Sequence, residues 1–385
     1  MMNKNKYLNW IEISRQALNN NINSLSKLAS GKLLAVSVKA NAYGHGISQI
    51  VSILKENPKV HYLTVHSLEE ALLCRNEGWT RNILIMGPVL LEEAEAIYNY
   101  DLEPVIVNRQ FLETLGKIGD KLNKTVKTHI KLETGTNRQG LDEKELPALA
   151  KIYLKHSSLQ KPYGAYTHFA NIEDTTSHDY AQYQLKRFDS ILKQLQTLKI
   201  KPEIRHTASS AATILFKKTH FEMVRPGISV YGYWPSKETY LSYRLEGGEN
   251  NLFIPVLSWK TKITQLKDLL PDSFIGYGCT YKTTSNTKLA IIPIGYYDGF
   301  PRSLSNNAYV LINGKRAPIR GRVCMNIFMA DVTDIKGVKL FNQAVLVGAS
   351  QKETISADLL AGWANTINYE IIARLSASIS RIIVD

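Results

Sequence analysis

The chain has 385 residues, of which 44% are hydrophobic and 21% charged, the balance of a globular protein with a large core and about two domains. Its net charge of +13 is spread along the chain without a basic block interleaved with aromatic residues, so we expect no nucleic-acid partner. No apolar run approaches the roughly 20 residues that span a bilayer, and the polar, basic residues 1–10 lack the apolar core of a secretory signal, so we expect no membrane association.

From residue 33 to about residue 230, short apolar runs alternate with longer amphipathic stretches. The runs that we expect to be strands are Leu33–Val38, Tyr62–Val65, Ile83–Met86, Pro104–Val107, Val126–Leu132, Gly164–Phe169, Glu203–His206 and Met223–Val224. Helical periodicity marks the segments Ser48–Leu54, Ser67–Glu77, Ala148–Leu154 and Tyr180–Leu198. Eight such units fit an α/β fold of the (β/α)8 TIM type better than an open doubly wound sheet, and no GxGxxG motif of a dinucleotide-binding domain follows the first run. We therefore expect a barrel over residues 11–245.

The pattern changes at Glu246–Asn250, a break that contains glycine and asparagine. Shorter runs separated by tight turns follow, namely Val256–Thr264, Leu289–Ile294, Tyr309–Ile312, Phe328–Val332 and Ala344–Val347. Asn313-Gly314 indicates a hairpin turn, and Ser356–Thr366 has helical periodicity. These features predict a C-terminal, mostly β domain over residues 246–385, which residues 1–10 are able to join.

The three cysteines, Cys74, Cys279 and Cys324, are scattered and odd in number. This pattern is typical of free thiols in a reducing cytoplasm, and it argues against a disulfide framework or a zinc site. We therefore expect a cytoplasmic protein without a metal.

Polar side chains gather where the predicted barrel strands end. In such a barrel the active site lies at the C-terminal ends of the strands. The residues expected at these ends are Lys39, Arg138, His168, His206, Ser210 and Arg225. Each alone is a weak indication, but their convergence predicts an active site on this rim.

Lys39 ends the first predicted strand. An amine at the end of an apolar strand loses hydration, so its pKa should fall, as a lysine that binds an aldehyde requires. The alternative is a lysine that extends from the strand end into solvent. Gly44 and Gly46 indicate that the following loop passes close to a neighbour, and the Tyr43 hydroxyl could bind a phosphate.

The loops after the seventh and eighth strands form the usual phosphate site of these barrels. Ser209 and Ser210 supply hydroxyls before a helix whose N-terminus favours an anion. Gly227 and Ile228 supply backbone amides in a second turn, and Gly227 permits close approach. Simple helix capping is the alternative role of the two serines.

An ordered series of motifs runs through nearly the whole chain. It comprises Val38–Gly46, Thr134–Arg138, Thr167–Ala170, His206–Ala212, Val224–Ile228, Gly276–Gly278, Pro293–Gly299, Gly321–Met325 and Asn368–Glu370. In these motifs the sequence resembles the alanine racemases, pyridoxal 5′-phosphate (PLP) enzymes built from a barrel and a C-terminal β domain. The resemblance implies a PLP-dependent racemase that interconverts L- and D-alanine.

Racemisation requires an acid–base group on each side of the cofactor. The resemblance implies Lys39 for one side and Tyr277 of the partner subunit for the other, so that a homodimer completes the site. It also implies that Arg225 lies against the pyridine nitrogen of PLP. A permanent cation keeps that nitrogen unprotonated, which disfavours transamination and decarboxylation.

The same resemblance implies supporting roles around the cofactor. His168 would belong to the network of Tyr277 or Arg225, and His206 would be a further supporting residue. Lys131 would carry a carbamate, an anion able to hold Arg138 near the substrate carboxylate.

Other residues match family positions at the entrance. Tyr369 would contact the cofactor phosphate, and Tyr296 and Met325 would meet the substrate from the neighbouring subunit. An outer charged gate is implied for Glu173, Arg302 and Arg322.

Five positions depart from the family pattern. Asn326 stands where an aspartate is usual, which removes a negative charge beside the substrate. The other departures are Thr136-Asn137, Tyr297 and Cys279. They affect the shape and charge of the pocket, so they bear more on alanine as substrate than on racemase chemistry.

Three alternative functions stay open. A racemase for serine or another small amino acid would share every group except the pocket wall. A decarboxylase of the same fold is disfavoured by Arg225, and a non-catalytic PLP carrier is disfavoured by the second domain. If the product is D-alanine, the resemblance implies that it supplies peptidoglycan synthesis.

Overall fold

The computed structural model describes residues 6–160 and 162–385. The chain forms two compact units. The barrel unit comprises Ala17–Ala40 and Ile50–Ile254, and the β unit comprises the segment that ends at Gln16, Asn41–Gln49 and Pro255–Asp385. The β unit thus includes Asn41–Gln49, which the sequence analysis assigned to the barrel domain; the division at residues 245 and 246 stays a prediction.

Eight parallel strands form the barrel unit's sheet. They are β2 (Leu33–Ser37), β3 (Tyr62–Val65), β4 (Asn82–Ile85), β5 (Glu103–Ile106), β6 (His129–Lys131), β7 (Gly164–Tyr166), β8 (Ile204–His206) and β9 (Met223–Val224). Their order is β8-β7-β6-β5-β4-β3-β2-β9. The two outermost strands are joined by backbone hydrogen bonds from Glu222 N to Arg205 O (3.2 Å) and from Arg225 N to Ala208 O (2.9 Å). The sheet is therefore a nearly closed barrel, and the predicted (β/α)8 class is confirmed.

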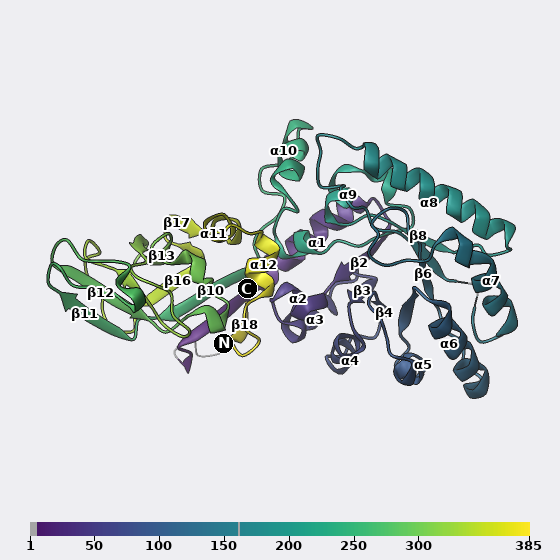
Figure 1. Cartoon of the computed structure of the whole chain (residues 1–385), viewed down its shortest axis with the longest axis horizontal. Coiled ribbons are helices and arrows are strands. Elements are labelled where there is room, and N and C mark those ends of the chain that lie inside the picture. Colours follow the sequence, from purple (N-terminus) through teal and green to yellow (C-terminus); the bar gives the residue numbers. More distant parts are fainter. Residues whose placement is uncertain (1–5, 161) are drawn as a thin grey trace. The chain divides into compact units, whose positions relative to one another are not determined.

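Helices lie outside the ring of strands (Figure 1). They include α1 (Arg15–Ala29), α3 (Ile47–Leu54), α4 (Leu68–Asn76), α5 (Ala94–Asn99), α6 (Arg109–Leu122), α7 (Leu146–Lys155), α8 (Asp179–Thr197), α9 (Ser210–Leu215) and α10 (Lys237–Leu245). Helix α6 illustrates how residues at its two ends determine where a helix begins and stops. Asn108 Oδ1 accepts from Phe111 N (2.8 Å) at its start, and Asn123 ends it in a left-handed conformation, because asparagine tolerates that region better than most residues.

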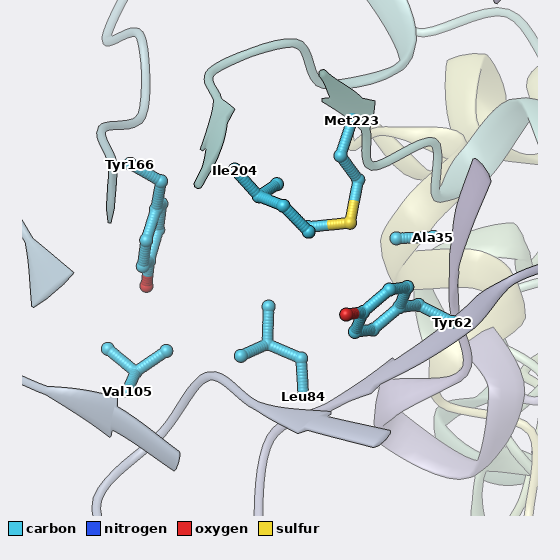
Figure 2. Packing of buried hydrophobic residues seen from close by; sticks show 7 residues of the cluster. All are labelled: Ala35, Tyr62, Leu84, Val105, Tyr166, Ile204 and Met223. Carbon is cyan, nitrogen blue, oxygen red and sulfur yellow. The ribbon is translucent and has the colours of Figure 1, made fainter. Parts of the chain in front are cut away.

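The barrel interior is filled by inward-facing apolar side chains. Seven of the eight strands contribute one residue each to this cluster, as Figure 2 shows: Ala35, Tyr62, Leu84, Val105, Tyr166, Ile204 and Met223. The eighth strand, β6, instead begins with the fully buried His129. A polar ring therefore replaces an apolar residue in the core, and it requires hydrogen-bond partners there.

The β unit contains a seven-stranded and a three-stranded sheet. The first has the order β14-β13-β16-β10-β1-β18 with β17 paired to β16, and the second the order β11-β12-β15. The strands are β1 (Asn9–Ser14), β10 (Leu257–Lys262), β11 (Gln265–Leu269), β12 (Thr287–Ile292), β13 (Tyr309–Ile312), β14 (Lys315–Pro318), β15 (Phe328–Asp331), β16 (Gln343–Ser350), β17 (Glu353–Ile355) and β18 (Ser380–Val384). Two helices, α11 (Ala357–Ala364) and α12 (Asn368–Ala373), precede the last strand.

The hairpin predicted at Asn313-Gly314 joins β13 and β14. Both turn residues have positive φ, 50° and 73°, as a two-residue hairpin turn requires. The three cysteines are free thiols. In the described part of the chain, no helix is long and apolar enough to cross a membrane, and no group of three or more His, Cys, Asp or Glu side chains could hold a metal ion.

Candidate active site

Lys39 follows β2 at the C-terminal rim of the barrel and begins the short helix α2 (Lys39–Tyr43). Desolvation lowers the pKa of its amine, and the positive charge of Arg138 lowers it further, whereas the charge of Glu70 opposes this shift. The residue as a whole is still exposed, so its desolvation is partial. The direction agrees with the expectation for a lysine that reacts as a neutral amine.

The turn after Lys39 is left-handed, which the sequence analysis did not predict. Residues 40–43 have φ between 52° and 54°, although no glycine is among them. Each such residue costs roughly 1–2 kcal/mol, so the surroundings must hold the turn. Ala40 N donates to Glu70 Oε1 (2.6 Å), and Asn41 Oδ1 accepts from Ile47 N (3.0 Å).

Arg225 is 6% exposed and lies just after β9. Its Nη1 donates to the Nδ1 (2.7 Å) and the carbonyl oxygen (2.6 Å) of His206, and its Nη2 donates to Thr167 O (3.1 Å). None of these partners is a carboxylate. Burial lowers the pKa of Arg225 to about 10, so the guanidinium remains a cation at neutral pH and would be stabilised by an electron-rich neighbour.

His206 continues into a buried chain of hydrogen bonds. Its Nε2 lies 2.8 Å from His129 Nδ1, and His129 Nε2 lies 2.9 Å from Glu103 Oε2. The sequence analysis singled out His206 but neither His129 nor Glu103. The sequence signal for these two residues is weak, because Glu103 directly precedes the apolar run Pro104–Val107 and His129 lies inside the run Val126–Leu132.

The loops after β8 and β9 meet, as predicted for a phosphate site. Gly227 N donates to Ser210 Oγ (2.9 Å), so one of the predicted amides is occupied by one of the predicted hydroxyls. The Oγ atoms of Ser209 and Ser229 are buried without a hydrogen-bond partner among the described residues. Buried hydroxyls normally have hydrogen-bond partners, so these two hydroxyls are available to bind a polar ligand between the loops.

Lys131 and His168 lie near the same cationic groups. Lys131 is 5% exposed, and its amine donates to Gln139 Oε1 (3.2 Å). Desolvation, followed by the charges of Arg138 and Arg225, lowers the pKa of Lys131 to about 8. Burial and the charge of Arg225 lower the pKa of His168 to about 3, so its ring is neutral.

Thr136, one of the departures from the family pattern, has a definite contact. Its hydroxyl donates to the carbonyl oxygen of His168. Gln184 Nε2 donates to the same oxygen (3.1 Å). The two hydrogen bonds hold the backbone of the loop after β7.

Within the β unit, Tyr43 and Tyr369 lie together, with ring centroids 6.2 Å apart. The backbone segments next to the two tyrosines are tightly packed, because a Cβ on Gly44 would lie 1.8 Å from Ile372 O. The predicted close approach is therefore present at Gly44, which also has a φ of 78°, a value that the sequence analysis did not predict. The two tyrosines predicted at the phosphate are thus neighbours.

Exposed apolar side chains gather on three neighbouring loops of the β unit. The exposed fractions are 74% for Tyr277, 43% for Tyr296 and 54% for Met325. Tyr296 N donates to Cys324 O (3.1 Å) and Tyr297 N to Met325 O (3.0 Å).

The third loop lies against this pair. A Cβ on Gly278 would lie 3.1 Å from the guanidinium carbon of Arg322, which is three residues before Met325. Tyr297 and Ile327 are exposed by 66% and 44%, and Asn326 is exposed as well. We call Tyr277, Tyr296, Tyr297, Met325 and Ile327 the aromatic patch.

Comparison with known proteins gives a consistent result for both parts of the chain. Residues 13–235 match the family model "Alanine racemase, N-terminal domain", and residues 256–383 match "Alanine racemase, C-terminal domain". The chain is 40% identical to an alanine racemase of Leptospira interrogans, over 99% of this chain and 97% of that protein. It is 38% identical to the alanine racemase of Halothermothrix orenii, over 97% and 96% of the two chains.

Solved structures agree. An alanine racemase from Bacillus anthracis with bound L-Ala-P has a TM-score of 0.88 at 32% identity, covering 98% of this chain and 95% of that one. The alanine racemase from E. faecalis has a TM-score of 0.89 at 28% identity and covers all of both chains.

Proposed function

The chain belongs to the alanine racemase family of isomerases, and we propose that it interconverts L- and D-alanine with PLP held at the barrel rim. The cofactor assignment rests on two kinds of buried polar group at that rim, a guanidinium and two hydroxyls, which lack their usual partners. Within residues 6–160 and 162–385, the buried Arg225 has no carboxylate partner, and the buried hydroxyls of Ser209 and Ser229 have no hydrogen-bond partner. An electron-rich ring nitrogen and a phosphate group would satisfy both.

Named residues fit each part of PLP. Lys39 supplies the amine that binds its aldehyde, and Arg225 supplies the donor to its ring nitrogen. The residues proposed for the phosphate are Tyr43, Ser209, Ser210, Gly227, Ile228, Ser229 and Tyr369. PLP would supply an electron-accepting ring that acidifies the α-carbon of the amino acid.

Two groups move the proton. Lys39 Nζ takes or returns the α-proton on one side, which its lowered pKa favours because more of the amine is neutral at a given pH. The hydroxyl of the partner subunit's Tyr277 does so on the other side. His168, whose ring is neutral, would support this network.

Arg225 selects the reaction. It presents only N–H donors, so it supplies no proton acceptor to the ring nitrogen and favours the unprotonated state of that atom. Negative charge on the α-carbon is then held for a short time, which favours prompt return of the proton over transamination.

The aromatic patch supports a homodimer. A cluster of exposed aromatic and aliphatic side chains is a common mark of a protein interface. Tyr277 belongs to this patch and is 74% exposed, which suits a side chain that completes the site of a partner subunit. Met325 and Tyr296 would then narrow the neighbour's entrance, and Arg138 would meet the substrate carboxylate.

Lys131 suits carbamate formation. With a pKa of about 8, a substantial fraction of its amine is neutral near that pH and can add to carbon dioxide, with release of one proton. The product is an anion beside Arg138. A carbonyl signal after incubation with 13C-bicarbonate, absent in Lys131→Ala, would support the modification.

Alanine is the proposed substrate, and supply of D-alanine for peptidoglycan in the cytoplasm is the proposed role. Incubation with PLP and L-alanine in deuterated water, followed by chiral chromatography and α-proton NMR, tests the reaction. Formation of α-deuterated D-alanine supports it. Exchange with serine but not alanine would instead favour a serine racemase, which Asn326 and Tyr297 leave open through the pocket wall.

Two variants test the assignment of the proton-moving groups. Lys39→Ala should lose the yellow absorbance of bound cofactor and all turnover. Tyr277→Phe should keep the absorbance but lose α-proton exchange mainly for one enantiomer. Equal loss for both enantiomers would contradict the two-sided mechanism.

A further inference from the structure

Four buried side chains connect the inside of the barrel to its rim. Glu103 and His129 begin β5 and β6, His206 ends β8, and Arg225 follows β9. Their exposed fractions are 4%, 0%, 0% and 6%. The three links measure 2.9, 2.8 and 2.7 Å, so the chain is continuous at hydrogen-bond distance.

The chemistry of these groups determines every donor in the chain. A guanidinium has only donors, so His206 Nδ1 must accept from Arg225. A neutral imidazole has one N–H, so His206 carries it on Nε2 and donates to His129 Nδ1. His129 then carries its own proton on Nε2 and donates to the carboxylate of Glu103.

Electrostatics supports a neutral ring at His206. Burial, followed by the charge of Arg225, lowers the pKa of His206 well below its ordinary value. A second proton on His206 would also direct an N–H at the guanidinium. Among the four hydrogen-bonded side chains, Glu103 is the one carboxylate, and it lies at the opposite end of the series from the Arg225 cation.

Packing restricts both rings. A Cβ on Gly164 would lie 2.0 Å from His129 Nδ1, so only glycine leaves room for this ring in β7. His206 stacks on Tyr166 with centroids 4.8 Å apart and planes 9° from parallel. Rings held in this way cannot rotate to exchange their two nitrogens.

We propose that Glu103 and His129 are positioning residues of the racemase, which set the proton positions along the chain and so hold Arg225 as a correctly directed donor. A leucine at position 103 would fill the apolar core but would leave the Nε2–H of His129 without its acceptor, so the carboxylate serves the hydrogen bond and not the packing. The role at Arg225 rests on the proposed function, whereas the proton positions do not.

The test uses the full-length protein labelled with 15N in its histidine rings, with and without PLP. Two-dimensional NMR distinguishes rings protonated at Nε2 from those protonated at Nδ1, and substitution of single histidines assigns the signals. We expect His129 and His206 to be neutral and protonated at Nε2 in both samples.

Glu103→Gln keeps the side-chain size but removes the charge. The amide of the new glutamine can donate as well as accept. The direction of every hydrogen bond in the series can therefore reverse, and His206 then directs an Nδ1–H at Arg225. We expect a mixture of ring protonation states and a fall of about 10- to 100-fold in kcat, as for other residues that orient an active-site group from behind. KM for alanine should change little, and Glu103→Asp, which keeps the anion, should recover part of kcat.

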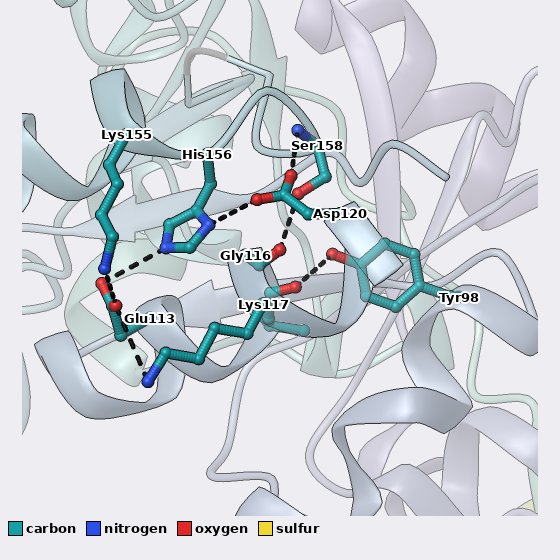
Figure 3. Close-up of polar contacts among 9 residues, drawn as sticks. Tyr98, Glu113, Gly116, Lys117, Asp120, Lys155, His156 and Ser158 are labelled. Atoms are coloured by element: carbon teal, nitrogen blue, oxygen red, sulfur yellow. Dashed lines mark hydrogen bonds and ion pairs between the residues drawn. The ribbon is translucent and has the colours of Figure 1, made fainter. Parts of the chain in front are cut away.

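The matched control is Asp120→Asn. Asp120 Oδ2 lies 2.7 Å from His156 Nδ1 in the outer helical layer (Figure 3), so the same kind of contact is lost away from the site. This variant should keep the wild-type ring states of His129 and His206 and the wild-type kcat.

Three results would overturn the proposal. They are a charged or Nδ1-protonated His206 in the wild type, unchanged ring states in Glu103→Gln, and changed ring states with wild-type kcat. The wild-type spectrum needs no variant, so a failure of Glu103→Gln to fold does not remove the test. Correct ring states in a protein that racemises no amino acid would contradict the proposed function and leave the proton positions intact.

Discussion

Two histidines of the barrel unit contact carboxylates in different surroundings. Inside the barrel, His129 and Glu103 are almost completely buried, and both ring nitrogens of His129 have partners. In the outer layer, His156 is also buried, but the side chain of its partner Asp120 is 37% exposed. Water can replace the outer contact and cannot replace the inner one.

The two clusters also end differently. The outer cluster ties α6 to the segment after α7, because Asp120 also accepts from Ser158 N (3.1 Å) and Ser158 Oγ donates to Gly116 O (2.9 Å), as Figure 3 shows. The inner chain ends at Arg225 on the rim. A histidine paired with a carboxylate thus joins α6 to the segment after α7 in one place and orients a site cation in the other.

The largest difference in stability between the two clusters is expected when their carboxylates are replaced. Glu103→Leu leaves a buried N–H of His129 without an acceptor and should lower the free energy of unfolding by about 3 kcal/mol. Asp120→Leu should lower it less, because water reaches the vacated position. Urea denaturation of both variants measures the difference, and equal losses would contradict the distinction.

Two glycines allow a matched comparison of ring placement. A Cβ on Gly164 would lie 2.0 Å from the His129 ring, and one on Gly116 would lie 2.4 Å from the His156 ring. Both alanine variants should lose roughly 1–3 kcal/mol of stability through overpacking. If Glu103 and His129 position Arg225 as proposed, Gly164→Ala alone should also lower kcat, by about tenfold. Steady-state kinetics on folded protein checks this, and equal kcat in the two variants would remove the functional difference.

Acid should act on the outer cluster through Asp120. Hydrogen bonds from His156 and Ser158 lower its pKa from 3.8 to about 2. Its contribution to stability is therefore complete above about pH 4 and is lost as the pH falls through about 2. Between these values Asp120→Asn should lose stability less steeply than the wild type. Parallel curves in pH-dependent urea denaturation would contradict this.

The smallest effect is expected at the surface of the outer cluster. Lys117 Nζ lies 3.8 Å from Glu113 Oε1, and the Lys117 side chain is 67% exposed. Exposed ion pairs contribute little, so Lys117→Ala should leave the urea midpoint within measurement error. A shift as large as that of Asp120→Leu would show that the outer cluster depends on its exposed charges.

Much of the site could be predicted because it follows from strand ends. Lys39, His206 and Arg225 each stand directly at or after an apolar run, and the barrel places such positions on one rim. Glu103 and His129 begin their strands and resembled ordinary flanking polar residues. Their partners are 26 and 77 positions away in the sequence, beyond the reach of any local pattern.

The left-handed turn after Lys39 escaped prediction for a related reason. Alanine and tyrosine disfavour positive φ, so local preference opposes the observed conformation at residues 40–43. Contacts from outside the turn hold it, among them the hydrogen bond from Ala40 N to Glu70.

The sequence by itself determined the barrel and the β-rich second part, because strand and helix periodicity are local properties of the chain. The tertiary structure decided which groups meet the buried rings of His129 and His206, and which carboxylate ends the series of hydrogen bonds that begins at Arg225. Those features depend on distances between residues far apart in the sequence, since a hydrogen bond has a direction only once donor and acceptor meet.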